Sequence, residues 1–266
     1  MKNLNYKVII LCGGKGTRIS EYSLVTPKPM IKIGKDPILL HIINHYYHFG
    51  LREFILTIGY KGEQIKEYFV KNYAKKFNLK KKIIYKKNYT KIIYSNNLII
   101  VMIDTGIKTQ TGGRILKCQN LFKKDEIFLL TYGDGISSIN IRNNIKIYKK
   151  SNKIGLVSAV RPPARFGKLK IKNDIVEKFE EKNQTDEGWI NGGFFVLNEK
   201  IFKFIKSNNT NFEMDSLKKL SNQKQLIAKK HYGFWQCMDT LREKNILEKL
   251  YKKNKNPWIF KKHLIS

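Results

Sequence analysis

Three glycines and two cations follow an apolar run near the start of the chain, in the stretch LCGGKGTR from Leu11 to Arg18. Glycines after a buried strand let backbone N–H groups approach an anion closely, and Arg18 adds a planar donor that is always charged. The stretch fails two familiar phosphate-loop patterns, because one needs glycine at Ile19 and the other needs Gly-Lys-Ser/Thr where the chain has Gly16-Thr17-Arg18. The stretch alone therefore indicates either a phosphate-binding loop or a tight strand exit without a ligand.

Lys28 and Asp134 add charges that favour the phosphate-binding interpretation. Lys28 stands between two prolines, which hold it on a rigid segment. Asp134 stands between two glycines at the end of the apolar run 127–132. Open α/β sheets bind their ligands at the carboxyl ends of strands, and glycine neighbours leave room for a metal and its waters. A simple turn aspartate is the alternative for Asp134.

Asp239 is the candidate for a second carboxylate. It stands at the end of an aromatic stretch, just before the last predicted helix. Helix capping is its alternative role, but Thr240 and Glu243 already form the pattern of a capping box, which leaves Asp239 free for another task. Because Mg²⁺ is usually held by one or two carboxylates together with substrate phosphates, Asp134 and Asp239 are the candidate metal pair.

Two groups in the second half of the chain suit a second phosphate or a sugar. Lys182 follows a predicted strand, although a surface position is its alternative. The stretch Asn191-Gly192-Gly193 places an amide beside an open backbone that can hydrogen-bond hydroxyls. The stretch 105–114, which ends in Thr-Gly-Gly-Arg, is another loop that suits an anion, because it leads into a helix N-terminus.

The composition favours a small anionic ligand over a nucleic acid. The formal net charge is +31, but only seven of the 52 basic residues are arginines, and the lysines are spread along the chain. Proteins that read nucleic acids rely on arginine for bidentate contacts. A basic nucleic-acid-binding protein stays as the alternative from another class. No targeting segment or membrane span is expected, and we expect neither nucleic acid nor membrane as a partner.

The histidines and cysteines are predicted to be structural. Three histidines fall at helical spacings without acidic or cysteine ligands nearby (His41, His45 and His48). The three cysteines form no CxxC pair and leave an odd count, so they are expected as free thiols in a reducing compartment, by default the cytoplasm.

Strand-like and helix-like segments alternate along the chain, which predicts a largely parallel sheet covered by helices. Strands are expected at 8–11, 51–59, 83–85, 98–103, 127–132, 154–160, 168–171, 175–179, 193–197 and 225–229. Helices are expected at 36–50, with Asp36 as N-cap, and at 65–77, 113–122, 139–149 and 241–253. We expect one domain, residues 1–266, with a nucleotide-binding lobe at about 6–160 and a sugar-phosphate lobe at about 161–266.

In their order along the chain, these motifs resemble those of the sugar-1-phosphate nucleotidyltransferases, whose hallmark is GGxGTR followed by Pro-Lys-Pro. The resemblance covers nearly the whole chain, through Gly13–Arg18, Pro27-Lys28-Pro29, Asp104-Thr105-Gly106, Thr111–Arg114, Tyr132–Gly135, Arg165-Phe166-Gly167, Asn191–Phe195, Gly233-Phe234-Trp235 and Met238-Asp239-Thr240. It is greatest for the cytidylyl-transferring members of the family. Cys12 departs from the family's usual alanine, and Asn183 from its usual proline.

The resemblance implies a Rossmann-like three-layer α/β/α fold with a mostly parallel mixed sheet. It implies Mg²⁺-dependent transfer of a cytidylyl group from CTP to glucose 1-phosphate, which gives CDP-glucose and pyrophosphate for bacterial surface polysaccharide. It also suggests a homo-oligomer, a hexamer in this family. The same chemistry with UTP, dTTP or another sugar 1-phosphate is the nearest alternative.

The resemblance also implies roles for individual residues. Arg18, Lys28 and Asp134 would be catalytic, Asp134 and Asp239 would hold Mg²⁺, and Lys182, Asn191 and Gly192 would bind the sugar phosphate. The nucleotide would be bound by Leu11, Cys12, Gly13, Gly14, Lys15, Gly16, Thr17, Arg18, Lys28, Thr109, Arg114 and Gly133.

Overall fold

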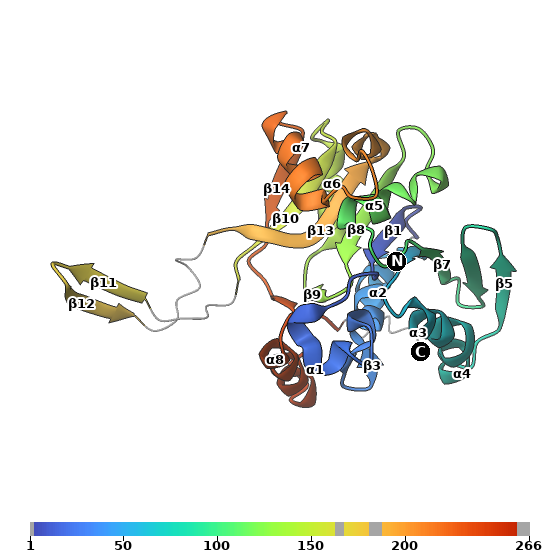
Figure 1. The fold of residues 1–266 in the computed structure, drawn as a ribbon, viewed down its shortest axis with the longest axis horizontal. Helices are drawn as coiled ribbons and strands as arrows, with labels where there is room; N and C mark the ends of the chain where they lie inside the picture. The colour runs from blue at the N-terminus through green and yellow to red at the C-terminus, as the bar shows by residue number, and fades with distance from the viewer. Residues whose placement is uncertain (1–2, 163–167, 181–187, 260–266) are drawn as a thin grey trace.

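The computed structural model of the chain describes residues 3–162, 168–180 and 188–259, so the predicted site residue Lys182 lies outside the described residues. The described residues build a nine-stranded mixed sheet in the order β14-β10-β13-β8-β1-β4-β7-β6-β5 (Figure 1). Its strands are β1 (Lys7–Leu11), β4 (Glu53–Ile58), β5 (Lys81–Tyr85), β6 (Thr90–Tyr94), β7 (Ile99–Asp104), β8 (Ile127–Tyr132), β10 (Gly155–Val160), β13 (Ile190–Asn198) and β14 (Leu226–Lys230). Strands from both expected lobes belong to this one sheet, and the division into lobes stays a prediction.

Four neighbouring strands in the middle of the sheet, β8, β1, β4 and β7, are parallel and end at the same edge. At this edge Leu11 of β1 pairs with Thr57 on one side and with Tyr132 on the other. β13 is antiparallel to β8, so its first residues lie at the edge where β8 ends. The loops that follow β1 and β8 therefore meet the start of β13, although these segments are far apart in the sequence.

The sheet is covered on both faces. Successive strand side chains point to opposite faces, so Val8 and Ile10 belong to one buried cluster and Ile9 to another. The first cluster includes side chains of α2 (Ile38–His48), α3 (Gly62–Glu67), α6 (Ile141–Lys149) and α8 (Leu241–Lys252), and the second includes those of α5 (Thr111–Leu116) and α7 (Lys218–Asn222). This mixed sheet, parallel in its middle and lying between two helical layers, confirms the predicted fold class.

The start of α2 differs from the prediction. Asp36 and Pro37 form the short strand β3 (Asp36–Pro37), which pairs with β2 (Lys32–Ile33), and the helix begins at Ile38 with Pro37 as its N-cap. The Asp36 carboxylate forms an ion pair with Lys76 instead of capping the helix. The prediction of Asp36 as N-cap is therefore wrong, because a tertiary ion pair and a strand pairing take this segment.

The predicted helix 65–77 is divided into three parts. α3 is followed by a wide π-helical turn, Tyr68–Tyr73, and then by α4 (Ala74–Lys76). Phe69 and Tyr73 in the wide turn are fully buried against the sheet. The helical spacing of the apolar residues indicated the correct buried face, but it did not predict the change in helix type.

Several short elements were not predicted from the sequence. They are β6, the turn of helix α1 (Ser20–Ser23), α7, and the small two-stranded sheet of β9 (Gly135–Ser137) and β15 (Trp235–Cys237). The predicted strands at 168–171 and 175–179 are present as the hairpin of β11 (Lys168–Lys172) and β12 (Ile175–Glu180), which stands apart from the main sheet (Figure 1). Across the described ranges, no helix has both the length and the apolar character that crossing a bilayer requires.

Candidate active site

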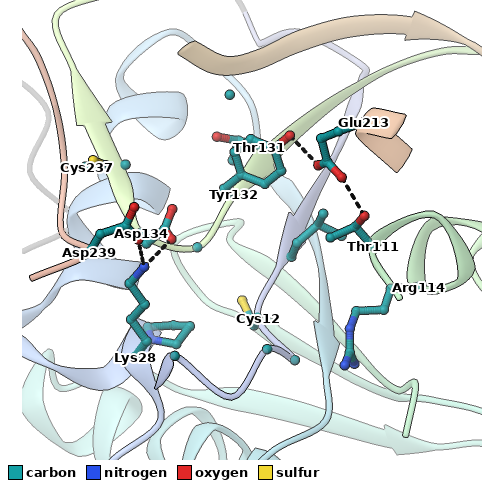
Figure 2. A pocket seen from close by; sticks show the side chains of 18 of the residues that line it. Cys12, Lys28, Thr111, Arg114, Thr131, Tyr132, Asp134, Glu213, Cys237 and Asp239 are labelled. Atoms are coloured by element: carbon teal, nitrogen blue, oxygen red, sulfur yellow. Dashed lines mark hydrogen bonds and ion pairs between the residues drawn. The ribbon is translucent and has the colours of Figure 1, made fainter. Parts of the chain in front are cut away.

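A cavity of about 580 Å³ opens where the loops after β1 and β8 meet the start of β13 (Figure 2). All but one of the predicted site residues that the structure describes line this cavity: Leu11, Cys12, Gly13, Gly14, Gly16, Thr17, Arg18, Lys28, Thr109, Arg114, Gly133, Asp134, Asn191, Gly192 and Asp239. Lys15 is the exception, and its side chain is exposed. The fold thus brings together residues from both halves of the chain.

The glycine-rich loop is anchored to the sheet at its start. The Cys12 N–H donates to the Thr57 carbonyl at 3.0 Å, and the Gly13 carbonyl accepts from the Tyr60 N–H at 3.2 Å. Gly16 has a φ of +66°, which turns the chain toward Lys28 and which a residue with a side chain adopts only with strain. Burial raises the pKa of the Cys12 thiol, so this residue packs as a small neutral side chain.

Lys28 forms ion pairs with both predicted metal ligands, and Arg18 forms one with Asp239. The Lys28 ammonium lies 2.6 Å from Oδ2 of Asp134 and also pairs with Oδ1 of Asp239. The Arg18 guanidinium lies 2.8 Å from the other oxygen of Asp239. Burial by itself lowers the pKa of Lys28, but the charges and hydrogen bonds of Asp134 and Asp239 outweigh burial and raise it. Lys28 therefore stays a cation although only 8% of the residue is exposed.

The predicted capping box is confirmed and leaves both oxygens of Asp239 directed at the cations. The Glu243 carboxylate accepts from the Thr240 N–H at 3.0 Å, and the Thr240 hydroxyl accepts from the Glu243 N–H at 3.3 Å. Glu243 also accepts from the Asp239 N–H at 2.7 Å, which fixes the backbone of the aspartate. The Cys237 thiol lies within 4.8 Å of carboxylate oxygens of Asp239 and Glu243. Burial raises its pKa to about 12.

The Arg114 side chain packs against the glycine-rich loop at Gly13. It is 4% exposed, and its Nη1 donates to the Thr105 hydroxyl at 2.5 Å and to the Gly106 carbonyl at 2.9 Å. A Cβ placed on Gly13 would lie 2.0 Å from this nitrogen, so glycine is required for the guanidinium to lie beneath the loop. The sequence predicted that both segments bind an anion, but it did not reveal that they touch each other.

The start of β13 forms the opposite wall of the cavity. The Trp235 indole N–H donates to the Gly192 carbonyl at 2.8 Å, and a Cβ on Gly192 would lie 2.7 Å from a methyl carbon of Val160. The Asn191 side-chain oxygen accepts from the Gly193 N–H at 2.8 Å. Asn191 and Gly192 therefore line the cavity, and their binding of a sugar phosphate stays a prediction.

The cavity is also lined by Glu213, which the sequence analysis missed, and by Tyr132 and Thr111, which it placed in motifs without assigning them a role. The Glu213 carboxylate accepts hydrogen bonds from the Tyr132 hydroxyl at 2.5 Å and from the Thr111 hydroxyl at 2.8 Å (Figure 2). No local motif marks Glu213, because it reaches the cavity only through the packing of the segment 212–217 against α5.

Two of the three histidines of α2, His41 and His45, are buried in the core, which agrees with the structural role that was expected. His41 Nε2 lies 2.9 Å from the Ile33 carbonyl oxygen, and the residue is 4% exposed. His45 is 3% exposed and packs edge-on against the ring of Phe49. Burial lowers the pKa of His45 to about 3, so this side chain is neutral at ordinary pH.

A glycine-rich loop and a carboxylate at the carboxyl ends of parallel strands, with two cations and a second carboxylate beside them, are features of α/β proteins that bind nucleotide phosphates. The sequence profile of the nucleotidyl transferase family matches residues 7–240, and the chain belongs to this family.

Relatives and solved structures agree with this assignment. The chain is 41% identical to the glucose-1-phosphate cytidylyltransferase of Salmonella typhimurium, over 95% of this chain and 98% of the relative. It is also 41% identical to a probable glucose-1-phosphate cytidylyltransferase of Bacillus subtilis, with the same shares covered. The crystal structure of a putative glucose-1-phosphate thymidylyltransferase from Bacillus anthracis superimposes with a TM-score of 0.66 at 17% identity, over 92% of this chain and 94% of that one. This last likeness concerns the fold alone.

Proposed function

We propose that this protein transfers a cytidylyl group from CTP to glucose 1-phosphate and releases pyrophosphate. The observation that carries the proposal is the 41% identity to the Salmonella glucose-1-phosphate cytidylyltransferase, which extends over 95% of this chain. The cavity supports it, because the predicted nucleotide, metal and sugar-phosphate residues within the described ranges line one space, Lys15 excepted.

In this proposal the nucleotide lies along the glycine-rich loop. Lys28 and Arg18, at one end of the loop, would contact the triphosphate, and the buried Arg114 lies at the other end, beside Gly13. A charge-assisted hydrogen bond from a guanidinium or ammonium to phosphate is stronger than a neutral one. The triphosphate would therefore offer both cations the same kind of bond that the aspartates now give them, which would leave the two carboxylates available for a metal.

Asp134 and Asp239 suit the Mg²⁺ that this proposal includes. Both carboxylates converge on the single ammonium of Lys28, so they are close enough to share one cation. Carboxylate oxygens are the ligands that Mg²⁺ prefers, and phosphates usually complete its shell. A metal held there would neutralise part of the negative charge that develops on the phosphates.

The remaining chemistry requires positioning more than a protein nucleophile. A phosphate oxygen of glucose 1-phosphate forms the new bond to the α-phosphorus of CTP, while the bond from that phosphorus to the bridging oxygen breaks and its electrons leave with pyrophosphate. Lys28 and Arg18 would stabilise the charge that moves onto the leaving group. Asn191 and Gly192 would hold the attacking sugar phosphate in line.

The proposal is tested by measuring pyrophosphate release with CTP, UTP, dTTP, ATP and GTP, each combined with several sugar 1-phosphates and Mg²⁺. CTP with glucose 1-phosphate should give the dominant signal. A dominant signal with UTP or dTTP would refute the cytidylyl assignment. Salt-sensitive binding to random oligonucleotides without Mg²⁺-dependent turnover would instead favour the nucleic-acid alternative. The hexamer, the cytoplasmic location and the role in surface polysaccharide stay predictions.

A further inference from the structure

Glu213 is a carboxylate of the cavity for which the proposed reaction has no role. It lines the cavity but points toward Tyr132 and Thr111, away from the pair of aspartates at Lys28 (Figure 2). Its backbone is held at the start of a helical segment, because the side chain of Asn211 accepts from the Glu213 N–H at 3.0 Å. Glu213 is therefore a fixed acceptor that faces the two hydroxyl groups.

The acceptor character of Glu213 sets the direction of a chain of hydrogen bonds. A carboxylate has no proton to give, so the Tyr132 hydroxyl must donate its only proton to Glu213, at 2.5 Å. The oxygen of Tyr132 can then only accept, and it accepts from Nδ2 of Asn191 at 3.1 Å. The other end of this amide, Oδ1, accepts from the Gly193 N–H at 2.8 Å. Both neighbours thus require the same orientation of the amide.

This orientation matters for an oxygen-rich ligand. The Asn191 amide group has two N–H donors, and Tyr132 takes one of them, so the second is available to a hydroxyl or phosphate oxygen in the cavity. If the amide were reversed, its oxygen would replace that donor, and two acceptors would face each other. Asn191 is exposed, so water can satisfy a reversed amide in the free protein, but a ligand that displaces this water would then face an oxygen instead of a donor. A reversed amide would therefore weaken binding of such a ligand.

We propose that Glu213 is a positioning residue for the sugar phosphate, acting through Tyr132 to hold the Asn191 amide with its donor toward the ligand. The inference rests on the proposed function for the identity of the ligand. Glu213 does not touch the reacting atoms, so its effect belongs to binding of the sugar phosphate. Binding of CTP and the rate at saturation depend on groups elsewhere in the cavity.

Glu213→Gln tests the direction of the chain, because a glutamine amide can donate to Tyr132, which leaves only the Gly193 N–H to hold the Asn191 amide in its orientation. The KM for glucose 1-phosphate should rise about tenfold, as expected for one lost hydrogen bond to a charged group, with the KM for CTP and kcat within about twofold of wild type. Tyr132→Phe removes the same link and should raise the same KM. The double variant should be no worse than the single ones, since both break one chain.

Thr111→Val is the control, because it removes the other hydrogen bond to Glu213, together with the bond that the Thr111 hydroxyl accepts from the Phe212 N–H at 2.9 Å, and leaves the link through Tyr132 to Asn191. Its KM for glucose 1-phosphate should stay within about twofold of wild type. The proposal is overturned if Glu213→Gln and Tyr132→Phe leave this KM unchanged, if they raise the KM for CTP equally, or if Thr111→Val has the same effect.

Failure of the proposed function has a separate signature. If wild-type protein prefers another nucleotide or another sugar 1-phosphate, the assigned substrates are wrong, and the same comparison of KM values is made with the preferred pair. A selective rise in the KM for that sugar phosphate would still support the role of Glu213. Wild-type protein without any turnover would overturn both proposals. Thermal unfolding of each variant shows whether its fold is intact.

Discussion

Gly13→Ala should displace Arg114 and thereby weaken nucleotide binding. A Cβ at this position would lie 2.0 Å from Nη1 and 2.5 Å from Cζ of Arg114, far below any real contact distance. The guanidinium must move, and Nη1 then loses its bonds to the Thr105 hydroxyl at 2.5 Å and to the Gly106 carbonyl at 2.9 Å. The substitution therefore acts on a residue that is about 100 positions away in the sequence.

The expected losses of stability and of CTP affinity in Gly13→Ala follow from the hydrogen bonds that Arg114 loses. A hydrogen bond to a charged group contributes about 1.5–3 kcal/mol, and water replaces part of this when the guanidinium moves outward. We expect the free energy of unfolding to fall by about 2–3 kcal/mol, measured by urea titration. If Arg114 binds the nucleotide through one charge-assisted bond, the Kd for CTP should rise about 10- to 100-fold, measured by calorimetry.

A double-mutant cycle separates this mechanism from general damage to the loop. In the Arg114→Ala background the guanidinium is absent, so Gly13→Ala should cost less than about 0.5 kcal/mol of stability. Gly14→Ala is the control for the fold, because no atom lies within 4 Å of a Cβ placed there, and its unfolding free energy should equal that of wild type. Additive effects of Gly13→Ala and Arg114→Ala, or wild-type behaviour of Gly13→Ala, would refute the reasoning.

Three further predictions concern the metal, the thiols and pH. Asp134→Ala should abolish turnover and leave the thermal midpoint almost unchanged, and near-normal turnover would contradict its metal role. Cys12 and Cys118 are free, buried thiols with raised pKa, so neither should react with a thiol reagent at pH 8 until urea unfolds the protein. Burial lowers the pKa of His45 to about 3, so the unfolded state binds a proton more readily. His45 should therefore lower stability by up to about 1.4 kcal/mol per pH unit as the pH falls from about 6.5 towards 3, so the loss should be less steep in His45→Gln, and equal slopes would contradict this cause.

The predicted α/β class and most strands and helices could be found from the sequence, because they follow local rules. The run 127–132 coincides with β8, and the pattern of Thr240 and Glu243 forms the capping box. Asp36 was the exception, since its ion pair with Lys76 joins segments that no local pattern connects. Short strands such as β9 and β15 were missed because only their pairing with each other makes them strands.

The sequence by itself determined which chemistry is available: a glycine-rich loop, a lysine between prolines, and two aspartates at strand and helix boundaries. These are properties of residue type and short spacing, which a single segment carries. The tertiary structure decided that Lys28 lies between Asp134 and Asp239, that Arg114 supports Gly13, and that Glu213 faces Tyr132. These contacts depend on strand order and register over more than 80 residues, which the packing of two buried cores selects and no local pattern records.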